Sequence, residues 1–250
     1  MKRILCFLLM LGMCMGNVVH AADTIVVGTS ADYPPYEFTD AKGEFVGFDM
    51  DLIRAIGKKI GKKVKIVDMG FDTLIAGLQN KKIDVVISAM QASEERKQKV
   101  DFSTSYHDIK DAILAKADSG IEIKSVYDIA KYKVASQTGT IQEKWIQENL
   151  IKTGKLSADN YFSYERVDNA AMDLKAGRMD LLLIIADPAT SLAEKNSLKI
   201  ALITTETVSA GQSLAVHKGN TVLLNAINKA IAELKADGTL KKMMDKYKLL

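Results

Sequence analysis

Arg96 is the residue of this sequence whose type and position best suit the binding of an anion. It follows an apolar stretch, Ile83 to Ile87, and the short loop Ser88 to Gln91. The planar guanidinium of an arginine can hold a carboxylate through two parallel hydrogen bonds. An arginine near the start of a helix is also commonly a solvated surface residue, so its immediate neighbours leave both interpretations open.

Other residue types that carry chemistry are few and scattered. The two cysteines are Cys6 and Cys14, and the three histidines are His20, His107 and His217. No phosphate-binding glycine motif and no nucleophile elbow occurs in the sequence. We therefore expect no catalytic residue, no metal site and no cofactor. The net charge of +3 is too balanced for a protein that grips nucleic acid.

The first 21 residues have the pattern of a secretory signal peptide. Met1-Lys2-Arg3 is positive, Ile4 to Met15 is almost entirely apolar, and Val19-His20-Ala21 precedes a cleavage site after Ala21. The apolar run is shorter than the roughly 20 residues of a membrane anchor. We expect residues 1–21 to be removed and the protein to be periplasmic. A surface lipoprotein through Cys14 is less favoured, because the preceding methionine is bulky where that processing needs a small residue.

The remaining chain contains the elements that must position Arg96 and its neighbours. Apolar stretches and helical spacing predict strands at 25–27, 64–67, 83–87 and 213–216, and helices at 50–60, 72–78, 222–234 and 240–247. This alternation predicts an α/β fold with a largely parallel sheet. Asp72 and Asp84 mark a helix–turn–strand unit, and Asp168 and Asp180 mark another at the same twelve-residue spacing. This weak repeat suggests two lobes of similar build.

Several spaced motifs cover essentially the whole chain after residue 21. They lie, in order, at residues 28–38 (with Tyr33-Pro34-Pro35-Tyr36-Glu37-Phe38), 43–52, 71–78, 83–90, 93–96, 137–140 and 237–240. In their composition and order these motifs resemble the family 3 extracellular solute-binding proteins. Members of that family are the periplasmic amino-acid receptors of ABC importers.

The resemblance implies a fold of two α/β lobes that close on a ligand like a flytrap. Each lobe would be a mostly parallel sheet flanked by helices, and two strands would form the hinge. Lobe 1 is built from both ends of the chain in this family, which agrees with two candidate crossings in the sequence. We expect lobe 1 at residues 22–107 and 212–250, lobe 2 at 112–207, and hinge crossings near 108–111 and 208–211.

The resemblance also assigns residues around a bound amino acid. It implies that Arg96 holds the ligand carboxylate and that the rings of Tyr33 and Phe71 enclose the ligand side chain. Thr140 would face them from lobe 2. Contacts to the ligand's carboxylate and ammonium are expected from the loop residues Ser88, Ala89, Met90 and Gln91. Ser30 and Asp32 would recognise the far end of the side chain, although Asp32 could also be a turn-capping aspartate.

One departure from the family concerns the ligand's ammonium. The family usually has an aspartate after the lobe 2 strand, where this sequence has Ile185 or Ala186, and Asp187 comes one or two residues later. Gln91 also replaces a short hydroxyl residue. A hydrogen bond to a charged group contributes about 1.5–3 kcal/mol, or roughly one to two decades of affinity. Three explanations stay open: Asp187 shifts inward, Gln91 compensates, or the ligand lacks a standard α-amino group.

The expected function is the capture of an amino acid, with a polar or basic one favoured. A monomeric receptor would then deliver it to a membrane-embedded ABC permease. An enzyme similar to cyclohexadienyl dehydratase shares the fold and would enlist carboxylates such as Glu165, Asp168 or Asp187. No paired carboxylates are evident from spacing, so we expect a binding protein. The sequence is also compatible with a receptor for a carboxylate without an α-amino group, and with a sensory domain.

Overall fold

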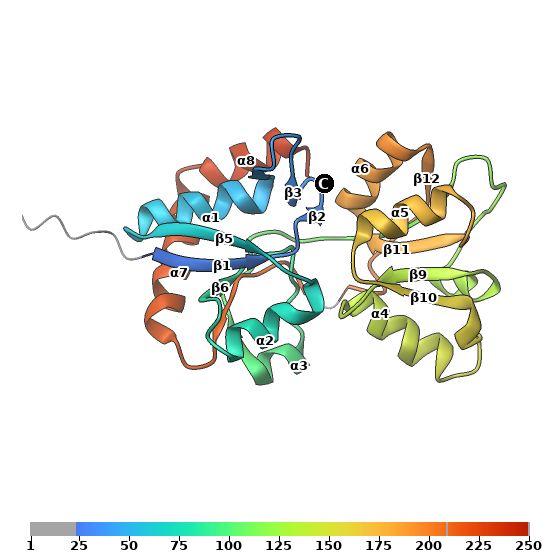
Figure 1. Cartoon of the computed structure of the whole chain (residues 1–250), viewed down its shortest axis with the longest axis horizontal. Coiled ribbons are helices and arrows are strands. Elements are labelled where there is room, and N and C mark those ends of the chain that lie inside the picture. The colour runs from blue at the N-terminus through green and yellow to red at the C-terminus, as the bar shows by residue number, and fades with distance from the viewer. Residues whose placement is uncertain (1–23, 209, 250) are drawn as a thin grey trace, which may run out of the picture.

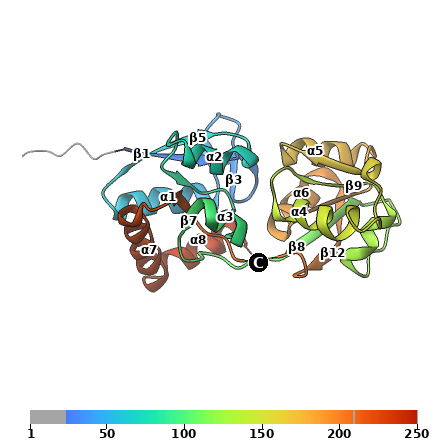
Figure 2. The same ribbon diagram turned by 90° about the horizontal axis from the view of Figure 1, so that it is seen from below.

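The computed structural model of the protein describes residues 24–208 and 210–249, so the predicted signal peptide lies outside the described residues. Two five-stranded sheets, each flanked by helices, form two lobes that lie side by side along the longest axis (Figure 1). A view from below shows the same two bodies, with chain segments running between them (Figure 2). The predicted two-lobe α/β architecture is thereby confirmed. Within the described ranges, no helix is both long and apolar enough to cross a membrane.

The sheet of lobe 1 takes strands from both ends of the described chain. Its order is β5 (Lys63–Asp68), β1 (Thr24–Thr29), β6 (Val85–Val86), β13 (Ala215–His217) and β7 (Val100–Phe102). β1 pairs parallel with β5 and β6, whereas β13 pairs antiparallel with β6 and β7. A small antiparallel sheet contains β2 (Asp32–Tyr33), β3 (Glu37–Thr39) and β4 (Phe45–Val46).

The helices of lobe 1 form where the apolar residues recur at helical spacing. They are α1 (Phe48–Lys59), α2 (Leu74–Gln79), α3 (Glu94–Lys99), α7 (Thr221–Ala236) and α8 (Thr239–Tyr247), with a 3₁₀ turn at Phe71–Thr73 before α2. α1 buries Ile53 and Ile56 on its inner face, as an amphipathic helix does. Gly61 follows it at a φ of +69°, a left-handed conformation that glycine adopts without strain.

Lobe 2 repeats this plan with its own sheet. The strand order is β10 (Tyr161–Tyr164), β9 (Val134–Gln137), β11 (Leu181–Ile185), β8 (Asp111–Lys116) and β12 (Leu198–Thr204). Its helices are α4 (Ile141–Ile146), which continues into a π turn at Gln147–Ile151, α5 (Val167–Lys175) and α6 (Ala186–Asn196), with 3₁₀ turns at Val126–Lys131 and Ala158–Asn160.

Both sheets are mixed, which corrects the prediction of mostly parallel sheets. β9 pairs parallel with β10 and β11, whereas β8 pairs antiparallel with β11 and β12. The antiparallel pairings of both lobes involve strands next to the crossings: β7 and β13 in lobe 1, β8 and β12 in lobe 2. A crossover helix joins parallel neighbours, but a strand that arrives from the other lobe is free of that constraint.

The repeat found in the sequence corresponds to an equivalent contact in each lobe. The Asp84 carboxylate accepts a hydrogen bond from the Val26 N–H at 2.8 Å, just before β6. The Asp180 carboxylate accepts one from the Lys133 N–H at 2.9 Å, just before β11. Each aspartate therefore fixes the start of a central strand to its parallel neighbour.

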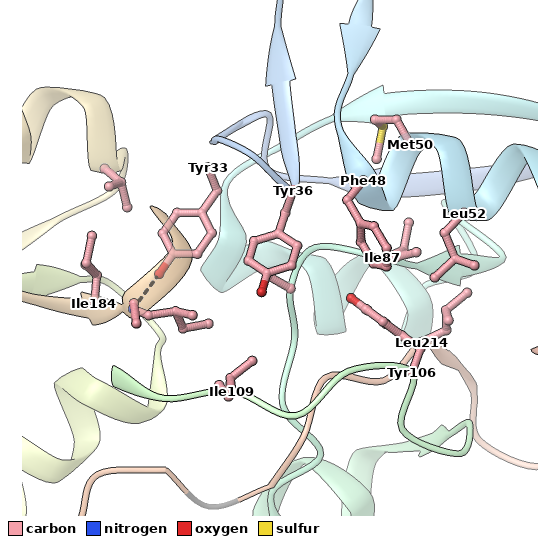
Figure 3. Close-up of a cluster of buried hydrophobic side chains, with 14 of the residues drawn as sticks. Tyr33, Tyr36, Phe48, Met50, Leu52, Ile87, Tyr106, Ile109, Ile184 and Leu214 are labelled. Carbon is pink, nitrogen blue, oxygen red and sulfur yellow. Dashed lines mark hydrogen bonds between the residues drawn. The ribbon is translucent and has the colours of Figure 1, made fainter. Parts of the chain in front are cut away.

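Two chain segments connect the lobes and run antiparallel to each other. The Tyr106 N–H donates to the Gln212 carbonyl at 2.9 Å, and the Gln212 N–H donates to the His107 carbonyl at 2.8 Å. Buried side chains fill the lobe 1 side of this junction, where Tyr36, Phe48 and Tyr106 lie together (Figure 3). The crossings therefore start from a packed core.

Candidate ligand-binding site between the lobes

A cavity with about 340 Å³ of empty volume lies between the two lobes. Residues predicted from the sequence form most of its wall: Ser30, Asp32, Tyr33, Phe71, Ser88, Ala89, Gln91, Arg96 and Thr140. Five further lining residues were not predicted: Glu37, Gln137, Ile141, Gln142 and Ile185. The cavity thus brings together segments that are separated by up to 155 residues, from Ser30 to Ile185.

Arg96 is the buried cation of this cavity. Its side chain leaves α3, which begins at the N-cap Ser93, and only 8% of the residue is exposed. Nη1 donates to the Gln91 carbonyl at 2.8 Å, and Nη2 donates across the cleft to the Gly139 carbonyl at 2.9 Å. The guanidinium carbon lies 5.3 Å from the ring centroid of Phe71.

No carboxylate balances this cation directly. Among residues 24–208 and 210–249, no carboxylate oxygen lies within 4.0 Å of the Arg96 guanidinium. Burial lowers the pKa of Arg96 to about 10, and the charge of Glu95 opposes that change. The side chain is therefore still cationic at neutral pH. A buried cation without a counter-ion is unfavourable, and an anionic ligand would remove that cost.

The loop after β6 is shaped by two buried carboxyl groups. The Ser88 hydroxyl donates to Glu37 Oε1 at 3.0 Å and accepts from the Ser30 N–H at 3.0 Å. The Ala89 N–H donates to Asp49 Oδ2 at 2.7 Å, and Ala89 has a φ of +47°. A non-glycine residue in this left-handed region is uncommon, so the Asp49 bond holds the backbone in the turn that aims Ser88 at the cavity.

Glu37 and Asp49 form a pair of buried carboxyl groups at the base of this loop, and each affects the pKa of the other. Burial raises the pKa of Glu37 well above its usual range, and the negative charge of Asp49 raises it further. Burial also raises the pKa of Asp49 to about 6, against the bonds from Ala89 and Tyr106. Two buried carboxyl groups in contact retain a proton between them. The pair therefore presents less than two negative charges to the cavity at neutral pH.

Asp32 joins the two lobes rather than facing the cavity alone. Its Oδ1 accepts from the Ser30 hydroxyl at 2.8 Å, and its Oδ2 accepts from the Val167 N–H of α5 at 2.5 Å. Arg166 Nε lies 3.7 Å from the same oxygen. Burial raises the pKa of Asp32, while the Val167 bond and the Arg166 charge lower it. The carboxylate is thus partly neutralised from lobe 2.

The two aromatic residues contact the cavity differently. Tyr33 is buried, and its hydroxyl accepts a hydrogen bond from the Ile185 N–H at 3.0 Å, the dashed line at its ring in Figure 3. It therefore links lobe 1 to the end of β11. Phe71 lies in the turn before α2 and packs against the Arg96 guanidinium. Its ring limits where the cation can point.

Thr140 caps α4 from the lobe 2 side. Its hydroxyl donates to the Gln137 carbonyl at 2.6 Å and accepts from the Glu143 N–H at 3.1 Å. The preceding Gly139 has a φ of +77°, and a Cβ there would lie 2.9 Å from the Cα of Asp72 in lobe 1. This is a close approach of the two backbones, and only glycine fits it.

Two predicted site residues lie outside the cavity wall. Asp187, in the first turn of α6, accepts from the Tyr36 hydroxyl at 2.6 Å and lies 3.5 Å from His107 Nε2. Its carboxylate therefore faces the junction of the lobes instead of shifting inward. Met90 is buried in a separate apolar cluster with Leu74. Successive side chains of an extended backbone point to opposite sides. Met90 therefore points away from the cavity that its neighbours Ala89 and Gln91 line.

Ion pairs and hydrogen bonds across the cleft hold the lobes together around the cavity. Arg166 Nη1 lies 3.0 Å from Asp68 Oδ1, and Lys144 Nζ lies 2.8 Å from Glu95 Oε2. The Arg166 side chain is 28% exposed, whereas Lys144 and Glu95 are about half exposed. Over the described residues, no group of three or more His, Cys, Asp or Glu side chains is arranged as a metal site.

Comparison with known proteins gives a consistent result. The family model described as bacterial extracellular solute-binding proteins, family 3, matches residues 25–249. L-cystine-binding protein TcyJ of Escherichia coli (strain K12) is 33% identical over 232 residues, 92% of this chain and 85% of that protein. ABC transporter arginine-binding protein 1 of the same strain is 33% identical over 253 residues, 99% of each chain.

A solved structure agrees with both. An ancestral arginine-binding protein bound to arginine is 38% identical, with a TM-score of 0.84, and covers 91% of this chain and 99% of that chain. The family match runs from β1 to the end of the described chain and so includes every described strand of both large sheets. The resemblance seen in the motifs is confirmed. This chain therefore belongs to family 3 of the bacterial extracellular solute-binding proteins.

Proposed function

We propose that this protein binds an amino acid between its lobes, with a basic side chain favoured, and delivers it to an ABC permease. The observation that carries the proposal is the buried Arg96 guanidinium, which lines the cavity without a carboxylate partner. A guanidinium has five N–H donors, and two protein carbonyls take one each. The remaining donors suit the carboxylate that every amino acid carries.

The composition of the cavity wall supports a ligand of this class. Ser30, Arg96 and Phe71 line it from lobe 1, and Thr140 and Gln142 line it from lobe 2. A few placed polar groups together with apolar side chains are typical of small-molecule sites.

The preference for a basic side chain rests on charge and on relatives. Asp32, in β2, lines the same cavity as Arg96, and the rings of Tyr33 and Phe71 can contact the stem of a long side chain. Relatives named as arginine-binding proteins match nearly the whole chain. A ligand with a carboxylate at one end and a cation at the other would be complementary to both charged groups.

Closure of the lobes is the mechanism that couples binding to transport. A ligand that contacts both lobes binds the closed form more tightly and shifts the population toward it. Cleft contacts such as those of Tyr33 with Ile185 and Arg166 with Asp68 form only when the lobes meet. A permease can then distinguish the loaded periplasmic receptor, a monomer, from the empty one by the relative position of its lobes.

Thermal melting and calorimetry with the twenty amino acids, with carboxylates that lack an ammonium, and with prephenate test this function. A ligand at a hundredfold excess over its dissociation constant stabilises the folded state by about 2.7 kcal/mol. We expect L-arginine or another basic amino acid to give such a shift, and Arg96→Ala to remove it. Lys97→Ala, which changes the exposed neighbouring residue, is the matched control. Turnover of prephenate, or binding unaffected by Arg96→Ala, would contradict the proposal.

A further inference from the structure

A ligand ammonium needs an acceptor, and the end of β11 does not provide a side chain for it. Ile185 is the last residue of β11 and lines the cavity with an apolar side chain. An unpaired ammonium next to it would be costly to bury. If the proposed function is right, the compensating charge must therefore come from another element, and the following inference rests on that function.

The neighbouring strand places a carboxylate opposite Ile185. β8 and β11 pair antiparallel, and the partner of Ile185 in their register is Asp111, the first residue of β8. Residues directly opposite in an antiparallel pair have their Cβ atoms about 4.5–5.5 Å apart on the same face. Asp111 is fully buried. The sheet thus carries a negative group beside the position where β11 has none.

Two neutral donors hold this carboxylate. Gln142 Nε2 donates to Asp111 Oδ1 at 2.7 Å, and the Thr207 hydroxyl donates to Oδ2. Burial raises the pKa of Asp111 to about 6, and these two bonds oppose the rise. Both partners are donors, which suits an ionised carboxylate. No cation lies within 4.0 Å of Asp111 among the described residues.

Gln142 connects this charge to the cavity. It is in the first turn of α4, and it lines the cavity together with Ile185. Its Nε2 is used by Asp111, so the other atom of the amide, Oε1, is the one left to face away from the carboxylate. Within the described chain, Oε1 accepts no hydrogen bond, and it is not among the fully enclosed polar atoms that lack a partner. A carbonyl oxygen in the cavity wall is an acceptor for an ammonium.

We propose that Gln142 Oε1 accepts the α-ammonium of the ligand and that Asp111, directly behind it, supplies the negative charge and fixes the orientation of the amide. Gln142 contacts the ligand, and Asp111 is a positioning residue that acts through Gln142. Hydrogen bonds in a chain polarise one another, so the carboxylate makes the amide oxygen a stronger acceptor.

The other buried carboxylates near the cavity have different partners. Asp32 is bonded to Ser30 and to the Val167 N–H. Asp187 accepts from Tyr36 and faces the junction of the lobes. Asp111 does not line the cavity itself, but it accepts from Gln142, a lobe 2 side chain that does.

The test compares L-arginine with 5-guanidinopentanoic acid, the same molecule without its α-amino group, by isothermal titration calorimetry. Gln142→Met keeps the side-chain volume but removes the acceptor. A hydrogen bond to a charged group corresponds to about ten- to a hundredfold in affinity, so we expect that loss for L-arginine. The affinity for 5-guanidinopentanoic acid should change by less than about threefold. Asp111→Asn should show the same selectivity with a smaller loss.

A double variant and a control separate this role from a structural one. If Asp111 acts through Gln142, the losses for L-arginine in Gln142→Met and Asp111→Asn will not add in the double variant. Asp187→Asn changes a buried carboxylate of the same lobe that does not line the cavity, and should affect both ligands alike. Should Asp111→Asn fail to fold, Gln142→Met alone still decides the matter.

Each further outcome identifies what has failed. Equal loss of both ligands in Gln142→Met, or a loss selective for L-arginine in Asp187→Asn instead, overturns the ammonium site but leaves the proposed function intact. Absence of binding for every amino acid in the melting panel refutes the proposed function and this inference with it. If a different amino acid gives the largest melting shift, that amino acid and its des-amino analogue replace the two probes.

Discussion

The two lobes end their equivalent central strands in different ways. In lobe 1, β6 leads into the loop at Ser88 and Ala89, where a hydroxyl and buried carboxyl groups surround the cavity. In lobe 2, β11 ends at Ile185 and enters α6 at once. Both strands start at an aspartate that makes the same backbone contact. The repeat thus preserves how the strand is anchored, but not what its far end offers to a ligand.

Because of this difference, the two lobes contribute different kinds of side chain to the cavity. The buried cation and the acid pair belong to lobe 1: Arg96 is in α3, Glu37 in β3 and Asp49 in α1. Lobe 2 lines the cavity only with neutral side chains, and its buried carboxylate Asp111 lies on β8, the strand next to β11. In lobe 1 the binding groups can therefore be located from the segments that follow the strands. In lobe 2 they can be located only from the pairing of neighbouring strands.

The largest expected effect comes from giving lobe 2 the aspartate that its strand end lacks. Ile185→Asp would place a second carboxylate opposite Asp111 in the β8–β11 register. A buried charge without a partner costs about 3–5 kcal/mol, so we expect a loss of that size in urea unfolding. Combining it with Asp111→Asn should restore most of the stability, because a single negative charge is then left. An Ile185→Asp variant as stable as the wild type would mean that the two positions do not face each other.

The second prediction concerns the contact that lets the two lobes meet. Gly139→Ala introduces a Cβ 2.9 Å from the Cα of Asp72 when the lobes are closed. We expect roughly tenfold or greater loss of ligand affinity, since closing then needs a backbone shift on top of the left-handed strain of about 1–2 kcal/mol. Gly154→Ala is the matched control. Gly154 also has a positive φ, at +72°, but no atom lies within 4 Å of its added Cβ. Calorimetry that shows equal affinities for both variants would rule out this contact as a condition of closure.

A third prediction concerns the pH dependence of stability, to which a buried carboxyl group of each lobe contributes. Burial raises the pKa of Asp49 in lobe 1 and of Asp111 in lobe 2 to about 6. The unfolded value is about 3.9, so the folded state binds these protons more tightly. The free energy of unfolding should therefore fall as the pH rises from about 4 to about 6, and stay lower above that. Asp49→Asn and Asp111→Asn should each remove about 1–3 kcal/mol of this fall. Urea titrations across that range measure it, and an unchanged slope in both variants would exclude these groups as its source.

The smallest effect is expected at the rim of the cleft. Lys144→Ala removes the ion pair with Glu95, but both side chains are about half exposed. Exposed pairs contribute about 0.2–1 kcal/mol, so affinity should fall by less than about fivefold. Arg166→Ala, which releases the more buried Asp32 and Asp68, should cost more. Calorimetry with both variants measures the order, and a larger effect of Lys144→Ala would reverse it.

Much of the lobe 1 wall could be predicted from the sequence because it is local. Ser88 and Arg96 follow the same apolar strand within a few residues, and Tyr33 follows β1 directly. The position of such residues depends on the strand that precedes them and not on the order of the other strands in the sheet. Glu37 was missed although it lies within the motif after Tyr33, since an acidic residue there gives no sign of being buried.

The lobe 2 wall could not be predicted in the same way. Asp187 was chosen as the nearest acidic residue after the strand, yet the start of α6 turns its carboxylate toward Tyr36. Asp111 and Gln142 are 31 residues apart and belong to different elements. Their contact with each other depends on the strand order β9, β11, β8 and on the antiparallel direction of β8 relative to β11.

The sequence by itself determined the family, the two-lobe α/β plan and the buried arginine of lobe 1. These follow from the order of motifs and from residues that are close along the chain. The tertiary structure alone decided which carboxylates face the cavity and that each sheet is mixed. The physical reason is that strand direction and register are set by the crossings between the lobes, and a register shift of one residue moves every side chain to the opposite face.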